Sequence, residues 1–565
     1  MRNRNPERVI EQRIASHVQR GEPVRLASVA ATTIMRVLLG RATLQRGRAP
    51  LFHLCDARIS GALELRNADV EVPLVFENCT FDEPVAIGDS DVKLLEFRAC
   101  AMPAFDGRSL RIARDLALTD TRIGWIDLFG ARIDGHLWLT GSCVQGARQE
   151  APAIDAPGIR VAGGVYANRL EALGTVNLWG AEIGAALELC NATLSSGRFP
   201  ALRASNLLAR LDVRIASSRI DGGIDLFGAR VGGDLWLTGT KVGDQEGDYA
   251  ISAPSIEVAG GFYARGLTVR GGLNLWSADI GAGLELDRAN LAASGRPALR
   301  APKMVVSGDI TVGYGAMISG AVDLDSATAG GSVKLAYRVD DEHMLSLSDS
   351  HLKMLCLEVL PGDLVQVNLA GSVVTALVDN QKYWPRVLNL DRMTYQTLRP
   401  LLSAKERVAW LKRDEGSDSP QPYEQLARQY REAGHDHGAR TVLLAKCRDR
   451  TRRQRFLPKL WGFLQDVTVG YGYRPVRALA WLAGLTIVVA VCSAVWRPYP
   501  VAGSAPPFNS AVYALDVVLP ILDLGQEKSY TAVGVGRIVV WIAVLAGWVL
   551  ASTVIAAVTR TTSRN

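Results

Sequence analysis

The residues best suited to metal or redox chemistry are eight cysteines and seven histidines, and their spacing predicts neither. The chain has no C-x-x-C pair and no Cys/His cluster with the spacing of zinc ligands. The closest histidines, His435 and His437, have too few further ligands nearby for a metal site. We therefore expect no metal, and we interpret the cysteines as small buried side chains in a reducing compartment. They are Cys55, Cys79, Cys100, Cys143, Cys190, Cys356, Cys447 and Cys492.

Motifs of common enzymes are also missing. A nicotinamide or flavin enzyme would need a G-x-G-x-x-G turn between a strand and a helix. The nearest candidate, GVGRIV from Gly534, lacks the third glycine and leads into an apolar segment. No G-x-S-x-G, P-loop or haem-attachment motif occurs. We therefore expect no catalytic residue, no cofactor-binding residue and no cofactor, although distant strands could assemble a site that no motif shows.

Two carboxylates in an apolar segment raise the question of ion conduction. Residues 508–525, FNSAVYALDVVLPILDLG, are too short for a full membrane span and are interrupted by Asp516, Pro520 and Asp523. Such a segment either dips partway into the membrane or rests on its surface as an amphipathic helix. Intramembrane carboxylates are costly unless they face water, a partner or an ion. Asp516, Pro520, Asp523 and Gly525 are therefore candidate residues of a membrane loop or pore.

A run of basic residues precedes the apolar C-terminal part of the chain. Juxtamembrane runs of this kind bind the anionic headgroups of lipids. The formal net charge of +6 over 565 residues is too weak to indicate a nucleic-acid binder. We expect contacts with a lipid bilayer and no nucleic acid. The candidate headgroup contacts are Lys446, Arg448, Arg450, Arg452, Arg453 and Arg455.

Two segments without charge, residues 478–496 and 538–558, are each about long enough to cross a bilayer. Basic residues precede the first and follow the second, whereas Lys528 is the only basic residue in 498–536. The positive-inside rule then places both termini and the N-terminal half in the cytoplasm. We predict a multi-pass protein of the inner (plasma) membrane. The flanking basic residues are Arg474, Arg477, Arg560 and Arg564.

A long internal repeat occupies the N-terminal half. DLFGARIDGHLWLTG from Asp127 recurs as DLFGARVGGDLWLTG from Asp225, and NLWGAEIGAALEL from Asn177 recurs as NLWSADIGAGLEL from Asn274. A block of roughly a hundred residues has therefore been duplicated. Within each block a shorter pattern, A-x-I-x-G-x-L-x-L, returns, and its two leucines lie on one face of a strand. Strands this short cannot pack alone, so we expect them to stack as the rungs of a solenoid.

These patterns predict a mainly β chain, in which a parallel β-helix precedes a TPR-like helical pair and a two-helix transmembrane hairpin. The predicted domains are a helical N-terminal cap at 1–50, the β-helix at 51–400, the helical connector with the basic run at 401–457, and the membrane domain at 458–565. An antiparallel β-sandwich is the alternative fold. It is disfavoured because hairpin dipeptides are missing and the repeat continues for longer than one sandwich.

The predicted connector has small and apolar residues at the positions where a TPR unit interlocks its two antiparallel helices. A single unit cannot form the usual peptide-binding groove. We therefore expect a structural coupler between the solenoid and the membrane. The matching residues are Tyr423, Leu426, Ala427, Tyr430, Gly434, Ala439 and Leu443.

Aromatic residues recur within the repeat. Strand alternation directs Trp138 and Trp236 outward, and Trp179 and Trp276 fall near corners. If these side chains align, they form an apolar stripe suited to a protein partner. The alternative is that they pack over corners and shorter rungs, covered by insertions such as residues 142–155.

Several longer pieces resemble a family of bacterial membrane proteins with pentapeptide-repeat-like or bactofilin-like β-helical rungs. The pieces are RGEPVRL from Arg20, the A-x-I-x-G-x-L-x-L rungs, PYEQLARQYREAGHDHGAR from Pro422, DVTVGYGYRP from Asp466 and YALDVVLPILDLGQ from Tyr513. Members are commonly labelled "membrane-associated oxidoreductase". The resemblance therefore implies an oxidoreductase, in contrast to the missing cofactor motifs.

Three functions follow from these patterns. The first is a membrane-anchored cytoplasmic scaffold or sensor whose solenoid binds another protein. The second is an oligomeric two-span ion channel gated by the solenoid, with Asp523 near the pore and Asp516 on the loop helix. The third is the oxidoreductase of the family label. The expected partners are an anionic lipid bilayer, a protein on the solenoid, and further copies of the chain in a homo-oligomer.

Overall fold

The computed structural model describes residues 6–40, 50–146, 151–197, 199–243, 249–414, 419–452, 475–501, 506–519 and 521–562. The chain divides into two compact units. The first contains Met1–Leu401 and Lys412–Ser419, and the second contains Leu402–Leu411 and Pro420–Asn565.

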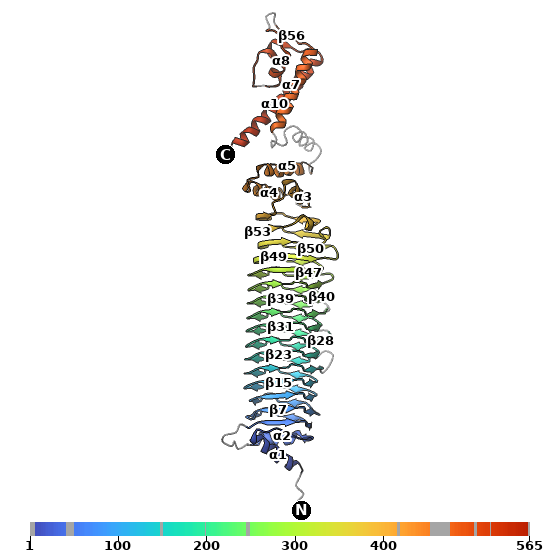
Figure 1. Ribbon diagram of the computed structural model, residues 1–565, viewed down its shortest axis with the longest axis vertical. Coiled ribbons are helices and arrows are strands. Elements are labelled where there is room, and N and C mark those ends of the chain that lie inside the picture. The colour runs from blue at the N-terminus through green and yellow to red at the C-terminus, as the bar shows by residue number, and fades with distance from the viewer. Residues whose placement is uncertain are drawn as a thin grey trace, which may run out of the picture. The chain divides into compact units, whose positions relative to one another are not determined.

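The first unit is a parallel β-solenoid of about 15 turns, which confirms the predicted β-helix (Figure 1). A typical turn has four short strands, such as β6 (Asp69–Val70), β7 (Leu74–Glu77), β8 (Thr80–Phe81) and β9 (Val85–Ala86). The first three belong to one parallel sheet and the fourth to a second parallel sheet of 15 strands. Each strand pairs with its counterpart one turn on, so the side chains of successive turns stack in columns.

The alternation of side chains along each strand builds the core of the solenoid. The two leucines of the predicted rung, Leu137 and Leu139, are both buried inside. Near the N-terminal end, Leu54, Phe76 and Phe97 occupy one inward column, and the rings of Phe76 and Phe97 stack with centroids 5.0 Å apart. Residues between the inward positions face outward, so their chemistry is available to the surface.

Tight corners separate the strands. At one corner of successive turns the backbone enters the left-handed region at Asn67, Asp89 and Ser109, with φ of 56°, 55° and 53°. Further along the same corner this position is taken by glycines such as Gly130 and Gly180. Glycine, asparagine and aspartate tolerate this conformation better than other residues. Their recurrence explains how the chain turns within so few residues.

The N-terminal region contains two helices and also the first strands of the solenoid. Helix α1 (Pro6–Arg20) packs against α2 (Ala31–Leu39), and α2 contacts the first strand of the second sheet, β5 (Leu63–Glu64). Between the helices, β1 (Val24–Arg25) and β2 (Ser28–Ala30) pair in parallel with the next turn. The solenoid thus begins before residue 51, because hydrogen bonding to the next turn draws this segment into the sheet. At the other end, the last strand is β55 (Thr394–Arg399).

The second unit begins with three helices, α3 (Ala404–Leu411), α4 (Gln421–Glu432) and α5 (Asp436–Arg452). Helix α5 packs against both α3 and α4. Six of the seven residues matched to a TPR unit are buried, and the seventh, Gly434, has a φ of 77° in the connection between α4 and α5. The helical pair is therefore present, while its relation to TPR units stays a prediction.

The second unit ends in apolar helices. Helices α7 (Pro475–Val495) and α10 (Val535–Thr562) pack against each other, and the shorter α8 (Ser510–Val518) contacts both. Within the described ranges one helical segment, Val535–Ser552, has the length and apolarity to cross a membrane. The described apolar part of α7, Leu479–Val495, is shorter than that criterion requires. The predicted two-span topology is thus supported by one helix only.

Candidate functional site

A four-residue motif of the repeat places an aromatic side chain at a solenoid corner. In D-L-F-G, Asp127 ends the short strand β17 (Ile126–Asp127), and its Oδ1 accepts a hydrogen bond from the backbone N–H of Phe129 at 3.0 Å. Leu128 points into the core, and Gly130 supplies the left-handed turn with a φ of 63°. The aspartate thus fixes the corner as an Asx-turn, and the aromatic ring is left outside.

The same construction recurs three more times. In each case an Asp or Asn oxygen accepts from the N–H of an aromatic residue two positions later, and a glycine or serine with positive φ follows. The pairs are Asn177 with Trp179 at 3.2 Å, Asp225 with Phe227 at 3.0 Å, and Asn274 with Trp276 at 3.2 Å.

These corners lie directly on one another. The N–H of Gly130 donates to the carbonyl of Pro157, and the N–H of Gly158 donates to that of Trp179. The pattern continues turn by turn, so one residue per turn occupies the same position. From Phe129 to Trp276 there are six turns, which at a spacing of about 4.8 Å span roughly 29 Å. We call this column the aromatic corner: Phe129, Pro157, Trp179, Ser205, Phe227, Pro254 and Trp276.

The rings of the aromatic corner are exposed. The exposed fractions are 56% for Phe129, 48% for Trp179, 48% for Phe227 and 39% for Trp276. The long insertions do not enter the solenoid at this corner. One of them joins β20 (Cys143–Val144) to the start of a second-sheet strand, whereas the aromatic corner follows the end of such strands. The exposure of these rings favours the prediction of an apolar stripe over the alternative in which insertions cover the aromatic side chains.

The two other tryptophans of the predicted stripe lie on a different face. Trp138 stacks on Tyr166, one turn on, and Trp236 packs against Tyr263, with centroids 4.4 Å apart in both pairs. All four rings are half-buried. The structure therefore separates the stripe into two columns.

Two members of the aromatic corner, Phe129 and Phe227, are absent from the sequence-based stripe. The sequence signal that indicates them is the D-L-F-G motif. It aligns with N-L-W-G, so its phenylalanine occupies the same position as the tryptophan of that motif.

The polar groups beside the aromatic corner are engaged by neighbouring turns. Arg108 pairs with the Asp127 carboxylate at 2.6 Å, and Ser205 donates to Asp225 at 2.6 Å. Asn177 donates to Asp155 at 2.7 Å. Because these polar groups already have hydrogen-bond partners within the solenoid, a protein that covers the aromatic rings does not leave them buried without a hydrogen bond.

The membrane-loop residues fall into two environments. Asp516 is buried, and its carboxylate accepts hydrogen bonds from the backbone N–H groups of Leu524, Gln526 and Glu527 at 2.7–2.8 Å. Asp523 is exposed and pairs with Lys528, and this partner holds the pKa of Asp523 below its usual value.

The remaining loop residues show how the segment turns. Gly525 has a φ of 77° and directly precedes α9 (Gln526–Ser529), whereas Pro520 lies outside the described residues. Helix α8 packs its Tyr513 and Val517 into a cluster with Leu482 of α7 and Ala543 of α10. The segment thus lies back against the two long helices, as a re-entrant segment would.

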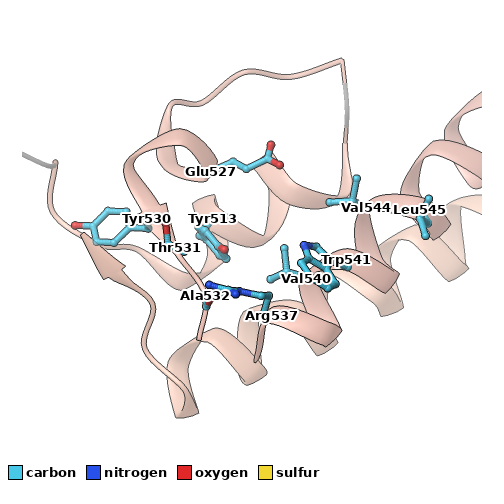
Figure 2. A pocket seen from close by; sticks show the side chains of 10 residues that line it. All are labelled: Tyr513, Glu527, Tyr530, Thr531, Ala532, Arg537, Val540, Trp541, Val544 and Leu545. Carbon is cyan, nitrogen blue, oxygen red and sulfur yellow. Dashed lines mark hydrogen bonds between the residues drawn. The ribbon is translucent and has the colours of Figure 1, made fainter. Parts of the chain in front are cut away.

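A pocket of about 580 Å³ opens beside this loop (Figure 2). Glu527 stands on one side of it and Arg537 across from it, with Val540 and Trp541 of α10 forming an apolar wall.

The basic run is described only in part. The Lys446 ammonium pairs with Glu424 of α4 at 2.5 Å. Arg448 and Arg450 are exposed on α5. The side chain of Arg452 and the whole of Arg453 and Arg455 lie outside the described residues. Lys446 therefore serves a contact within the helical pair, and the contacts of the basic run with lipid headgroups stay a prediction.

The structure also brings together a His, a Cys and a Glu that the spacing analysis missed. Potential ligand atoms of His53, Cys55 and Glu77 all lie within 4.8 Å of one another. Burial and the Glu77 carboxylate raise the pKa of the Cys55 thiol to about 11. His53 and Cys55 are two apart on one strand, but Glu77 comes from the next turn, so no local motif could reveal the group.

Comparison of the chain with protein-family models, curated proteins and solved structures finds no match. The resemblance to β-helical membrane proteins therefore stays a prediction, and the function has to be inferred from the geometry.

Proposed function

We propose that the chain is a membrane-anchored scaffold that binds another protein along the aromatic corner of its solenoid. The observation that carries this proposal is the alignment of four exposed aromatic rings in one column. Tryptophan and other large aromatic residues dominate the binding energy of protein interfaces. A line of exposed aromatic side chains has no role in the solenoid core, so its conservation through the internal duplication points to a contact outside it.

The dimensions of the aromatic corner define the partner. A column of roughly 29 Å matches an α-helix of about 19 residues, at 1.5 Å per residue. The aromatic rings alternate with proline or serine, which leaves shallow gaps between them for a partner's side chains. We therefore propose that the occupant is an amphipathic helix of a different protein, lying lengthwise with its apolar face on the rings.

The anchor in this proposal consists of α7 and α10 as two membrane spans. Helix α7 is apolar along its described part and packs against α10, and this packing supports a second span. With both spans, the positive-inside rule leaves the solenoid and both termini in the cytoplasm. Arg448 and Arg450 then contact anionic headgroups, and the α4–α5 pair, which lies between solenoid and anchor in the sequence, acts as a TPR-like coupler.

Site-specific photo-crosslinking in the native cell tests the docking surface. A photoreactive phenylalanine analogue replaces Trp179 in one variant and Phe227 in another. The control carries the analogue at Leu173, which is 57% exposed but lies outside the aromatic corner. We expect the same adduct, with a different protein, from positions 179 and 227 and none from 173.

Each other outcome is informative. An adduct with twice the mass of this chain would replace the proposed partner with a second copy. Equal adducts from all three positions, or no adduct at all, would overturn the docking surface.

The re-entrant packing of α8 favours a second candidate function, an oligomeric ion channel. In this alternative Asp523 is the better candidate for contact with ions, because the carboxylate of Asp516 is occupied by three backbone N–H groups. Planar-bilayer recordings of the full-length protein and of Asp523→Asn test it. Discrete currents altered by the substitution would support a channel, and silent bilayers with inserted protein would exclude it.

A further inference from the structure

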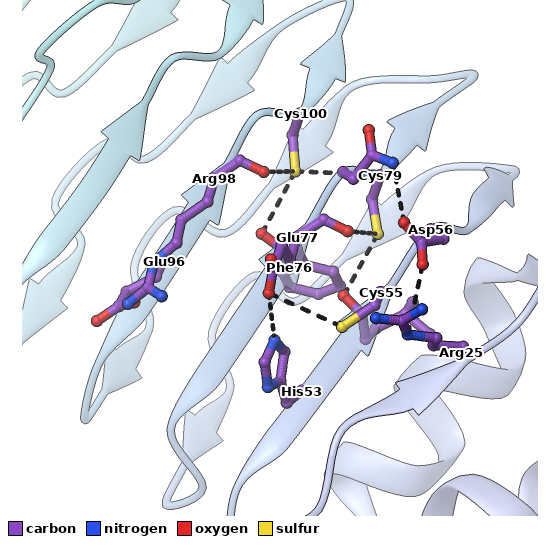
Figure 3. Close-up of polar contacts among 12 residues, drawn as sticks. Arg25, His53, Cys55, Asp56, Phe76, Glu77, Cys79, Glu96, Arg98 and Cys100 are labelled. Atoms are coloured by element: carbon purple, nitrogen blue, oxygen red, sulfur yellow. Dashed lines mark hydrogen bonds and ion pairs between the residues drawn. The ribbon is translucent and has the colours of Figure 1, made fainter.

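We propose that His53, Cys55 and Glu77 form a binding site for one zinc-like divalent cation on the outer surface of the first solenoid turns. This site is separate from the aromatic corner and from the membrane loop, and it does not depend on the scaffold proposal. Figure 3 shows the three side chains converging from two neighbouring strands.

The fold brings the three donors together. Strand β3 (Phe52–Cys55) pairs in parallel with β7, with Cys55 opposite Glu77. Phe52 and Leu54 point into the core, so His53 and Cys55 share the outward face. Cys55 is only 5% exposed, so the thiol lies at the buried end of the site. The more exposed Glu77 lies at the solvent side, on the next turn.

The distances suit a metal ion. His53 Nε2 lies 3.0 Å from Glu77 Oε2, and Cys55 Sγ lies 3.9 Å from the same oxygen. Tetrahedral zinc with bonds of about 2.0–2.3 Å holds its ligand atoms about 3.3–3.8 Å from one another. Small rotations of the side chains would therefore bring all three into coordination. A water molecule would complete the tetrahedron on the open side.

The neighbouring charges leave the site available. Arg25 lies next to Cys55 on the preceding turn, but it pairs with Asp56 at 3.6 Å. Arg98 lies next to Glu77 on the following turn, but it pairs with Glu96. Both guanidinium groups are thus directed to other carboxylates, and Glu77 is free to face His53 and Cys55.

The donor set determines the class of ion. A thiolate, an imidazole and a carboxylate together favour a borderline cation such as Zn²⁺ or Co²⁺ over Mg²⁺ or Ca²⁺, which prefer oxygen ligands alone. On binding, the Cys55 S–H bond breaks, the sulfur–metal bond forms, and the proton leaves to solvent. The metal would tie β3 to β7 at the start of the solenoid.

Cobalt titration of the full-length protein in detergent tests the site. Co²⁺ bound by a thiolate gives a sulfur-to-metal charge-transfer band, which Zn²⁺ abolishes on displacing it. We expect this band to saturate at one equivalent, to disappear in Cys55→Ser, and to require at least about tenfold more metal in His53→Gln and Glu77→Gln. Cys143→Ser removes another partly exposed thiol and should leave the titration unchanged.

A second readout covers the case in which the cysteine variant does not fold. Zn²⁺ should raise the melting temperature of the wild-type protein but not that of Glu77→Gln, whose substitution lies at the more exposed edge of the site. The proposal is overturned if no band saturates at one equivalent, if Cys55→Ser keeps the band, or if the well-folded Glu77→Gln variant binds as tightly as the wild type.

Discussion

The carbonyl oxygen of Val518, at the end of α8, lies directly against Gly547 of α10, where a Cβ atom would come within 2.2 Å of it. This approach is closer than any side chain permits. It allows α8 to pack against the long apolar helix α10, and it identifies Gly547 as the residue on which that packing depends.

Replacing Gly547 by alanine should therefore destabilise the helical unit. Overpacking of this kind costs about 1–3 kcal/mol, against a gain in helix propensity of roughly 1 kcal/mol. Gly484→Ala is the matched control, because Gly484 lies on α7 with nothing within 4 Å of an added Cβ. Thermal unfolding in detergent should show a lower melting temperature for Gly547→Ala than for Gly484→Ala. Equal melting temperatures would contradict this contact.

Asp516 should stabilise the loop through its carboxylate. In Asp516→Asn the charge is lost, and the amide group cannot accept all three backbone hydrogen bonds. We expect a loss of about 2–3 kcal/mol in the free energy of unfolding. Asp523→Asn, at the exposed pair with Lys528, should change the free energy of unfolding far less, because solvent screens that pair. Thermal unfolding of both variants compares them, and a similar loss in each would show that the buried contacts of Asp516 are unimportant.

The left-handed corners should resist substitution even where space is open. Gly180 has a φ of 62° and no atom within 4 Å of an added Cβ, so Gly180→Ala should cost about 1–2 kcal/mol through backbone conformation alone. Gly197 has equal space without a positive φ, so Gly197→Ala should be neutral or stabilise by up to about 1 kcal/mol. Denaturant unfolding measures the difference. If both substitutions change the free energy of unfolding by the same amount, the left-handed backbone conformation is not the reason for glycine at this corner.

The stability of the solenoid should fall in mild acid because of His343. This histidine is buried against Tyr337, at 2.8 Å from the hydroxyl group, and burial lowers its pKa from 6.5 to about 4. Between pH 6.5 and pH 4, His343 binds a proton in the unfolded chain but not in the folded chain. The free energy of unfolding therefore keeps its full value above pH 6.5 and decreases as the pH falls toward 4, by at most about 3 kcal/mol.

Denaturant unfolding between pH 7 and 4 measures this dependence. His343→Gln should flatten the pH profile in that window relative to the wild type. His351→Gln removes an exposed histidine and should keep the wild-type profile. A wild-type profile in His343→Gln would show that other groups control the acid sensitivity.

Local patterns in the sequence were sufficient for the architecture. The spacing of Leu137 and Leu139 predicted two inward side chains on a short strand, and both are buried. The seven positions matched to a helical pair likewise lie in or between α4 and α5. These predictions succeed because periodicity and turn chemistry act over a few residues.

The relations that matter for function depend on register between turns. Trp138 and Trp179 were grouped by sequence, but they lie in different columns, and Phe129 joins Trp179 instead. Cys55 meets Glu77 only because β3 and β7 pair at that offset. A shift of one residue would turn every side chain of a strand to the other face.

The amino-acid sequence by itself determined that this chain is a stacked β-helix followed by helices and an apolar C-terminal part, because alternation, repeat length and corner residues are properties of neighbouring positions. Only the tertiary structure decided which outward side chains share a column, that Asp516 is enclosed by backbone N–H groups, and that His53, Cys55 and Glu77 converge. The physical reason is that insertions of different length separate successive turns, so hydrogen bonding between turns, rather than distance along the chain, sets which residues become neighbours.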